Sequence, residues 1–210
     1  YCNIGDGGLA GIAAGLKKLR QLEHFQISMR NCLNLGDAGL VSLSVALPNS
    51  LLFLRLNFAN LSCNLSDAGL AALAHRLPEN VTELCIHCNG ASRISSAGLA
   101  ALAAGLPRRS LKRLQLDFGF CLELEDSGLA ALGSALSMLA LEELRLDFAV
   151  AKFSDAGLAA FGAGLPPALQ RLSMNMEFCR KMSMAEEDEM FSDPSLFRVW
   201  AAKWHEVNVA

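Results

Sequence analysis

One short segment of the chain, Cys85-Ile86-His87-Cys88, has the residue types of a zinc-binding site. A Cys-x-x-Cys pair holds zinc from a turn, where its two thiolates converge on the metal. This segment instead falls in an apolar–polar alternation typical of a strand, so Cys85 and His87 face one way and Cys88 faces the other. No second pair follows at a suitable spacing. We therefore predict no metal here and expect His87 to pair with Asp117 on a neighbouring strand.

Other residues that could support catalysis also lack the spacing that a reaction requires. The segment Gly5-Asp6-Gly7-Gly8 does not match the G-x-x-x-x-G-K pattern of a phosphate-binding loop. No serine lies in the G-x-S-x-G pattern of a nucleophile elbow. The four histidines occupy dissimilar places in the chain and form no catalytic cluster: His24, His75, His87 and His205. The sequence therefore predicts a protein that is not an enzyme and needs no cofactor.

Composition and charge exclude further classes of protein. The 210 residues are 52% hydrophobic and 19% charged, which is too apolar for a disordered chain. The formal net charge is −3, so the chain lacks the basic excess that favours binding to nucleic acid. No apolar run approaches the ~18 residues that a membrane span requires. We therefore predict a folded protein with neither a nucleic-acid footprint nor a membrane span.

Two sequence markers recur along the chain with a period of 29 to 31 residues. The first is a Gly-Leu pair followed by an Ala/Leu-rich stretch, and it begins at Gly8, Gly39, Gly69, Gly98, Gly128 and Gly157. The second is Leu-x-x-Leu-x-Leu or a close variant, and it begins at Leu22, Leu51, Val81, Leu111, Leu141 and Leu169. Because both markers advance together over six units, we interpret them as an internal structural repeat.

Each unit combines a strand pattern with a helix pattern. In residues 114–118 apolar and polar side chains alternate with period two, as in a strand buried on one side. In residues 98–106 the leucines fall on one face of a helix, which Ser95 caps and Pro107 follows. Ser66 and Ser154 hold the same capping position, and the acids of the first helical turn, where the helix dipole favours negative charge, include Asp67 and Asp155.

One strand and one helix cannot bury their apolar faces alone, so the units must stack. Stacked strands need only ~4.8 Å each, whereas packed helices lie about 8–10 Å apart. We therefore predict an α/β solenoid that bends, with a parallel β-sheet on its concave face and α-helices on its convex face. The repeat length and the Leu-x-x-Leu-x-Leu…Leu-Ser-Asp-x-Gly-Leu pattern of residues 1–176 resemble leucine-rich repeats of the ribonuclease-inhibitor subclass. The resemblance implies a horseshoe arc of about six repeats.

The turn after each strand departs from this family. Leucine-rich repeats usually place Asn or Cys there to bond the backbone of the loop, and only Asn89 matches. One residue earlier, in phase with the inward leucines, the chain carries Phe58, Phe118 and Phe148. We predict that these rings form an aromatic spine that fills the bend between strand and helix, while the bonding of the loop backbone stays open.

Both ends of the chain depart from the repeat. Residues 2–9 align with residues 63–70, so the sequence starts within a unit. We expect upstream repeats of a longer array rather than a second protein on this edge. Residues 177–210 are typical of an acidic loop followed by a helix that begins near Pro194. This helix either caps the last repeat or docks on a partner through Phe197, Trp200 and Trp204.

Four of the seven cysteines occupy one position of the repeat: Cys2, Cys32, Cys63 and Cys121. A ladder of small buried side chains explains this placement better than a disulfide framework does. Buried thiols are typical of a reducing compartment, so we expect an intracellular protein, in the cytoplasm or in an organelle.

Strand residues that alternate with the core leucines vary from unit to unit, as a surface that meets solvent or a partner does. A rigid sheet with a polar stripe of mixed charge suits the binding of a protein. We therefore predict a non-catalytic protein-interaction module. The alternatives are an accessory subunit of a large assembly and, by resemblance to some leucine-rich repeat proteins, a GTPase activator. The predicted partner-binding residues on the concave face are Phe53, Arg55, Asn57, His87, Arg113, Gln115, Asp117, Glu143, Arg145, Asp147 and Arg171.

Overall fold

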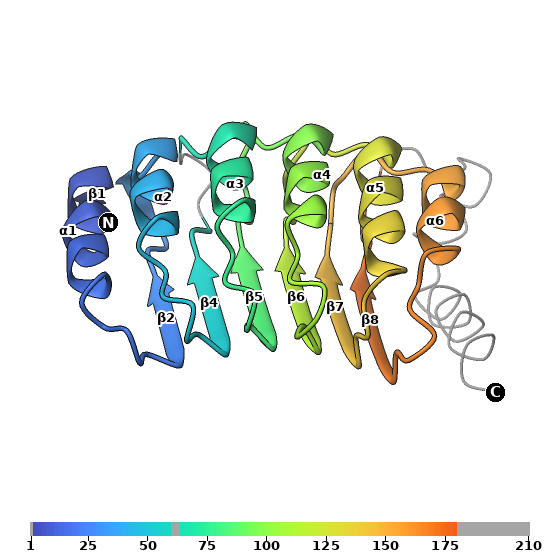
Figure 1. Ribbon diagram of the computed structural model, residues 1–210. Helices are drawn as coiled ribbons and strands as arrows, with labels where there is room; N and C mark the ends of the chain where they lie inside the picture. The colour runs from blue at the N-terminus through green and yellow to red at the C-terminus, as the bar shows by residue number, and fades with distance from the viewer. Residues whose placement is uncertain (1, 60–63, 180–210) are drawn as a thin grey trace.

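The computed structural model describes residues 2–59 and 64–179 and has an α/β architecture in which strands and helices alternate. One parallel sheet contains six strands, in spatial order β2 (His24–Ser28), β4 (Phe53–Asn57), β5 (Glu83–His87), β6 (Arg113–Asp117), β7 (Glu143–Asp147) and β8 (Arg171–Asn175). The helices form a second row beside it (Figure 1): α1 (Asp6–Leu16), α2 (Asp37–Ser44), α3 (Asp67–Ala74), α4 (Ser96–Ala104), α5 (Asp126–Leu136) and α6 (Asp155–Gly162).

Neighbouring strands pair in register, so equivalent positions of successive units lie side by side. Arg55 is opposite Cys85, and Cys85 is opposite Gln115. The same register continues from β6 through β7 to β8 without a bulge. The strands therefore occupy the residues that the alternation predicts, and the prediction of a parallel sheet is confirmed.

A second, shorter ladder runs along the edge where the helices begin. The strands β1 (Cys2–Gly5) and β3 (Cys32–Asn34) pair in parallel. Single bridges continue this pairing from unit to unit, as between Ser66 and Arg93 and between Ser95 and Glu123. The sequence did not predict this ladder, because its segments are too short to show alternation. Each segment becomes extended by pairing with the same segment of the next unit.

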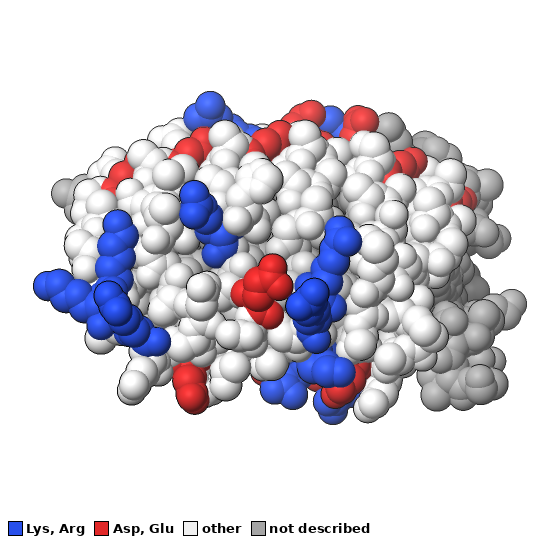
Figure 2. Space-filling view, in the orientation of Figure 1, with Lys and Arg blue, Asp and Glu red and all other residues white. Residues whose placement is uncertain are grey.

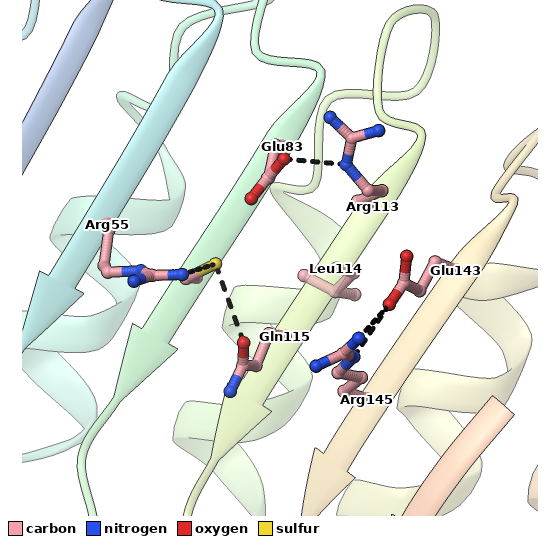
Figure 3. A pocket seen from close by; sticks show the side chains of 8 residues that line it. Arg55, Glu83, Arg113, Leu114, Gln115, Glu143 and Arg145 are labelled. Carbon is pink, nitrogen blue, oxygen red and sulfur yellow. Dashed lines mark hydrogen bonds and ion pairs between the residues drawn. The ribbon is translucent and has the colours of Figure 1, made fainter. Parts of the chain in front are cut away.

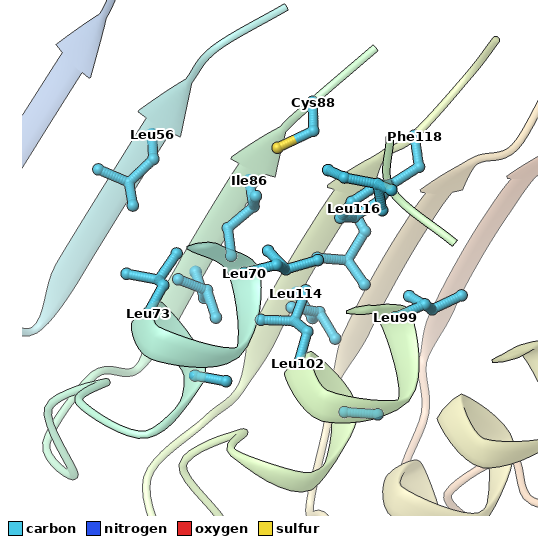
Figure 4. Close-up of a cluster of buried hydrophobic side chains, with 14 of the residues drawn as sticks. Leu56, Leu70, Leu73, Ile86, Cys88, Leu99, Leu102, Leu114, Leu116 and Phe118 are labelled. Atoms are coloured by element: carbon cyan, nitrogen blue, oxygen red, sulfur yellow. The ribbon is translucent and has the colours of Figure 1, made fainter. Parts of the chain in front are cut away.

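Leucines from the sheet and the helices form one continuous core between the two rows. Leu114 and Leu116 of β6 contact this core from the sheet side, and Leu99 and Leu102 of α4 contribute from the helix side (Figure 4). All four are 0–1% exposed. The stacking that the sequence predicts therefore buries the leucines of both markers. Among the described residues, no helix is both long and apolar enough to cross a bilayer.

The aromatic spine is confirmed at the bend between strand and helix. Phe58, Phe118 and Phe148 are at most 1% exposed. The rings of Phe118 and Phe148 stack with centroids 6.3 Å apart, and Phe153 meets Phe148 edge-on at 5.4 Å. Cys88 holds the spine position in the unit between Phe58 and Phe118, and its side chain is buried in the same core. The spine position is therefore buried in each of these units, although the unit of β5 places a cysteine there instead of a phenylalanine.

First-turn aspartates connect several of the helices to the next unit. Asp67 accepts hydrogen bonds from the backbone N–H of Ser95 at 2.7 Å and from its hydroxyl at 2.6 Å. Ser95 in turn caps α4 by accepting from the N–H of Ala97. The same links join Asp37 to Ser66 and Asp126 to Ser154. Acidic side chains accordingly form a row along this edge, on a surface that is otherwise mostly uncharged in this view (Figure 2).

This linkage explains why glycine recurs in the Gly-Leu marker. A Cβ atom on Gly98 would lie 3.1 Å from the Asp67 Cα and would also clash with the carboxylate that Ser95 holds in place. The clash is with the preceding unit, since Gly98 lies within α4. The glycine therefore permits the close approach of two helices rather than an unusual backbone conformation.

Replacing Gly98 with alanine is expected to destabilise the protein, although alanine normally favours a helix by about 1 kcal/mol. Overpacking costs about 1–3 kcal/mol, so we expect a net loss of about 1 kcal/mol in the free energy of unfolding. Gly11 in α1 is the matched control, because no atom lies within 4 Å of its Cβ position. The Gly11→Ala variant is expected to gain about 1 kcal/mol. Urea unfolding followed by circular dichroism measures both, and equal gains would contradict the close-approach explanation.

Candidate functional site

Side chains at the first, third and fifth positions of each strand point away from the leucine core and form what we call the open sheet face. The strand burial patterns show this alternation, most clearly in β4 and β6. All the residues that the sequence predicts for a concave binding face lie here: Phe53, Arg55 and Asn57 on β4, His87 on β5, Arg113, Gln115 and Asp117 on β6, Glu143, Arg145 and Asp147 on β7, and Arg171 on β8.

Two open-face residues are buried, although simple alternation predicts exposure. Cys85 is 3% exposed and Glu143 is 8% exposed. Longer side chains cover them: Arg55 and Gln115 lie within hydrogen-bond range of the Cys85 sulfur, and Arg145 binds Glu143 from its own strand. The predicted exposure of these two residues is therefore wrong. The physical reason is that in-register neighbours with long side chains fold over short or charged ones.

Ion pairs organise the edge of the open sheet face where the strands begin. Glu143 lies between Arg145, at 2.6 Å, and Arg171, at 3.1 Å. Glu83 pairs with Arg113 at 2.7 Å. This hydrogen bond raises the pKa of the Arg113 guanidinium above its ordinary value. Three of the predicted binding arginines therefore already hold a carboxylate within the protein.

At the opposite edge, the last residue of each of four strands bonds the turn that follows. The side chain of Asp147 accepts from the backbone N–H of Ala149 at 3.1 Å, two residues further along. The same contact is made from Asn57 to Ala59, from Asp117 to Gly119 and from Asn175 to Glu177. These Asx-type bonds supply the loop bonding that the sequence left open. Asn57, Asp117 and Asp147 thus have a structural task beside any binding role.

The predicted pairing of His87 with Asp117 is confirmed, with Nδ1 and Oδ2 3.4 Å apart. Asn89 also donates to Asp117, at 3.3 Å. Burial by itself raises the pKa of Asp117, but the hydrogen bonds from His87, from the backbone of Gly119 and from Asn89 outweigh burial and lower the pKa. The lowered pKa stabilises the fold above the ordinary carboxyl pKa, and this contribution is lost as the pH falls through the lowered value.

A left-handed residue recurs in the turns that follow the strands of the sheet. Its position is held by Asn31, Gly90, Phe120, Val150 and Phe178, with φ between 58° and 79°. Asparagine and glycine adopt this conformation readily, whereas a β-branched residue such as Val150 does so at a cost. Phe120 and Phe178 are 49% and 60% exposed. Sequence reasoning missed this position, since its residue types share no property that would mark a turn.

A pocket of about 180 Å³ opens at the centre of the open sheet face, over β4 to β7 (Figure 3). The Arg55 guanidinium lies 3.8 Å from the Cys85 sulfur, and this sulfur lies 3.9 Å from the Gln115 side-chain oxygen. Burial raises the pKa of the Cys85 thiol despite the nearby guanidinium, so the thiol stays neutral at physiological pH. The remaining lining residues are Glu83, Arg113, Leu114, Glu143 and Arg145. The arrangement provides charged hydrogen-bonding groups and no activated nucleophile.

The cysteine ladder is confirmed where its side chains are described. Cys32 and Cys121 are buried in the core, while the side chains of Cys2 and Cys63 fall outside the described part. Cys179 continues the ladder after β8, which the sequence did not predict, and burial raises the pKa of its thiol to about 11. Among residues 2–59 and 64–179, no three His, Cys, Asp or Glu side chains form a group that could hold a metal ion.

The predicted aromatic docking residues Phe197, Trp200 and Trp204 lie outside the described residues, as does most of the segment 177–210. The cap and docking interpretations of that segment therefore both stay predictions. Comparison with known proteins does not add a family: no protein-family model matches the chain, and no curated protein matches it either.

Proposed function

We propose that the chain is a leucine-rich repeat solenoid similar to the ribonuclease-inhibitor subclass, with the open sheet face on its concave side. The support is the 30-residue offset between paired strands such as β4 and β5, together with the separate row of helices. Because stacked helices need about twice the spacing of stacked strands, the sheet lies on the shorter, inner side of the arc.

On this fold, the open sheet face acts as a non-catalytic surface that binds a partner protein. The observation that carries this proposal is the contrast between the two sides of each strand. The inward positions are leucine or isoleucine in β4, β5 and β6, whereas the third residue of each strand, which faces outward into the pocket, changes from Arg55 to Cys85 to Gln115. Packing explains the constant side, and recognition of a partner explains a varied, hydrogen-bonding side with a central pocket. Buried thiols at Cys85 and Cys179 support a reducing, intracellular compartment.

Reversing two charges on this face is expected to abolish partner capture. We expect the double variant Arg113→Glu, Arg145→Glu to retain at most about a tenth of the cross-linked partner, because charged contacts across an interface contribute about 1.5–3 kcal/mol each. Cross-linking mass spectrometry in a native extract measures capture. The matched control is Arg108→Glu, Arg109→Glu, which reverses two exposed charges in the turn before β6.

Because Arg145 also pairs with the buried Glu143, the charge-reversed variant could lose capture by misfolding. A second variant distinguishes this outcome from the loss of a binding contact. Gln115→Trp fills the pocket without removing any ion pair, and it is expected to reduce capture to a similar extent. Circular dichroism should show unchanged helix content in this variant. Wild-type capture by both Gln115→Trp and the charge-reversed protein would overturn the proposal.

A further inference from the structure

The four arginines of the open sheet face are not equivalent. Arg113, Arg145 and Arg171 each lie within 3.1 Å of a glutamate oxygen. Among the described residues, Arg55 has no carboxylate within ion-pair distance, although it occupies the same sheet. Guanidinium groups that are half-buried normally meet a carboxylate or a carbonyl oxygen. Arg55 therefore has hydrogen-bonding capacity that its own chain does not use.

The contacts of Arg55 show which of its nitrogen atoms have unused hydrogen-bonding capacity. Its terminal nitrogen Nη2 contacts only a weak acceptor, the neutral thiol of Cys85, at 3.8 Å. Its Nε atom is buried and has no hydrogen-bond partner, and it is the one such side-chain atom among the described residues. The guanidinium lies over the ring of Phe53, 5.6 Å from the centroid. Only a thiol contact and a ring contact hold the Arg55 side chain, so its guanidinium can rotate and direct its N–H groups into the adjoining pocket.

Charge in the pocket selects the kind of group that fits. Three arginines and two glutamates line it, which leaves an excess of one positive charge. Glu83 pairs with Arg113, and Glu143 pairs with both Arg145 and Arg171, so Arg55 is the lining arginine that holds no carboxylate. A single carboxylate neutralises this excess, whereas a dianionic phosphate would bring a second negative charge close to Glu83 and Glu143. The volume of about 180 Å³ accommodates one short acidic side chain.

An apolar shelf adjoins the pocket on its β4 side. His24 and Phe53 stack with ring centroids 5.7 Å apart and 28° between the ring planes. A residue two positions from the acid in an extended partner segment points to the same face as the acid and lies about 7 Å along the segment, so it reaches this shelf. Apolar or aromatic side chains suit this surface, because the Phe53 ring is half-buried and the exposed His24 ring stacks on it.

We propose that Arg55 is the anchor for a carboxylate of the partner protein: an Asp or Glu side chain, with an apolar residue two positions away, enters the pocket and accepts a forked pair of hydrogen bonds from the guanidinium. This inference rests on the proposed function and adds the chemistry of the bound segment. Arg55 is a binding residue; Cys85 positions it by direct contact, and the Cys85 thiol in turn contacts Gln115. Arg113 and Arg145 stay paired with Glu83 and Glu143, and these ion pairs form the sides of the pocket.

A nuclear magnetic resonance titration tests this directly on the full ¹⁵N-labelled chain. The probe is acetyl-Phe-Ser-Glu-Ser-Phe-amide, and the matched peptide carries Gln in place of Glu. We expect the Nε–Hε signal of Arg55 to shift saturably with the Glu peptide, and the Gln peptide to bind at least about tenfold more weakly. Arg55→Gln should weaken the Glu peptide by a similar factor, while Arg108→Gln leaves binding unchanged.

Three results would overturn the assignment. The first is the absence of any Arg55 shift with the Glu peptide, and the second is undiminished binding to the Arg55→Gln variant. The third is tighter binding of a peptide with phosphoserine in place of Glu, which would assign the pocket to phosphate. Arg55→Lys is a further check, because it keeps the charge but loses the planar fork, so its affinity should fall between wild type and Arg55→Gln.

The same variant separates this inference from the proposed function. If Arg55→Gln captures the native partner as wild type does, while Gln115→Trp does not, the open sheet face binds a protein but Arg55 is not its anchor. If neither variant changes capture, the proposed function itself fails. Loss of capture in both, with the Glu-dependent shift at Arg55, supports the two together.

Discussion

The Leu116→Asp variant is expected to lose most of its folded structure at room temperature. Leu116 is fully buried between the sheet and the helices, so the new carboxylate would have no partner and no water. An uncompensated buried charge costs about 3–5 kcal/mol, a large part of the ~5–15 kcal/mol that stabilises a typical domain. Circular dichroism at 222 nm with a urea titration measures the loss.

The adjacent residue provides the matched control. Gln115 is one position earlier on the same strand and points to the open sheet face, so Gln115→Asp adds the same charge on the solvent side. We expect its urea midpoint to stay close to that of wild type. Equal midpoints for the two variants would contradict the assignment of leucine positions to the core.

Truncating the spine at Phe148 is expected to cost about 3–5 kcal/mol. Phe148 is fully buried, stacks on Phe118 and meets Phe153 edge-on, so alanine would leave a cavity between two units. Units of a repeat protein stabilise one another mainly through such contacts with their neighbours. We therefore expect the units around β7 to unfold first, and hydrogen exchange resolved by residue would detect this as lost protection near Phe118 and Phe153.

An exposed phenylalanine in the corresponding turn of the preceding unit is the control for the Phe148 variant. Phe120 is 49% exposed, and its truncation removes little buried area, so Phe120→Ala should change the free energy of unfolding by less than about 1 kcal/mol. If Phe148→Ala proves as mild as Phe120→Ala, the spine does not stabilise the repeat in the way we describe.

The sheet could be predicted from the sequence because its determinants are local and repeated. In Leu114-Gln115-Leu116-Asp117 the alternation marks both the strand and its buried side, and the repeat period places Gln115 beside Cys85. The capping serines could be predicted for the same reason, since Ser95 stands directly before its helix. Features that follow from one unit, or from repeating that unit at a fixed period, could therefore be predicted from the sequence.

Features that depend on contacts between units were not accessible in the same way. The aspartate at position 67 was explained by the dipole of its own helix, whereas its hydrogen bonds reach Ser95 of the next unit. Burial of Cys85 and Glu143 depends on how far neighbouring arginines extend, which spacing does not specify. The unmatched Nε of Arg55 likewise emerges only once the partners of every other arginine are known.

The uniform register of β4 to β7 has a consequence for how such a chain can change in length. Phe53, Glu83, Arg113 and Glu143 are successive partners, thirty residues apart. A recombination that deletes or duplicates thirty residues would rejoin equivalent positions, so the core leucines on both sides of the junction would again meet apolar core positions of a neighbouring unit. The protein can thus gain or lose a whole unit in one genetic event, and with it one row of the open sheet face, without passing through an intermediate that cannot fold.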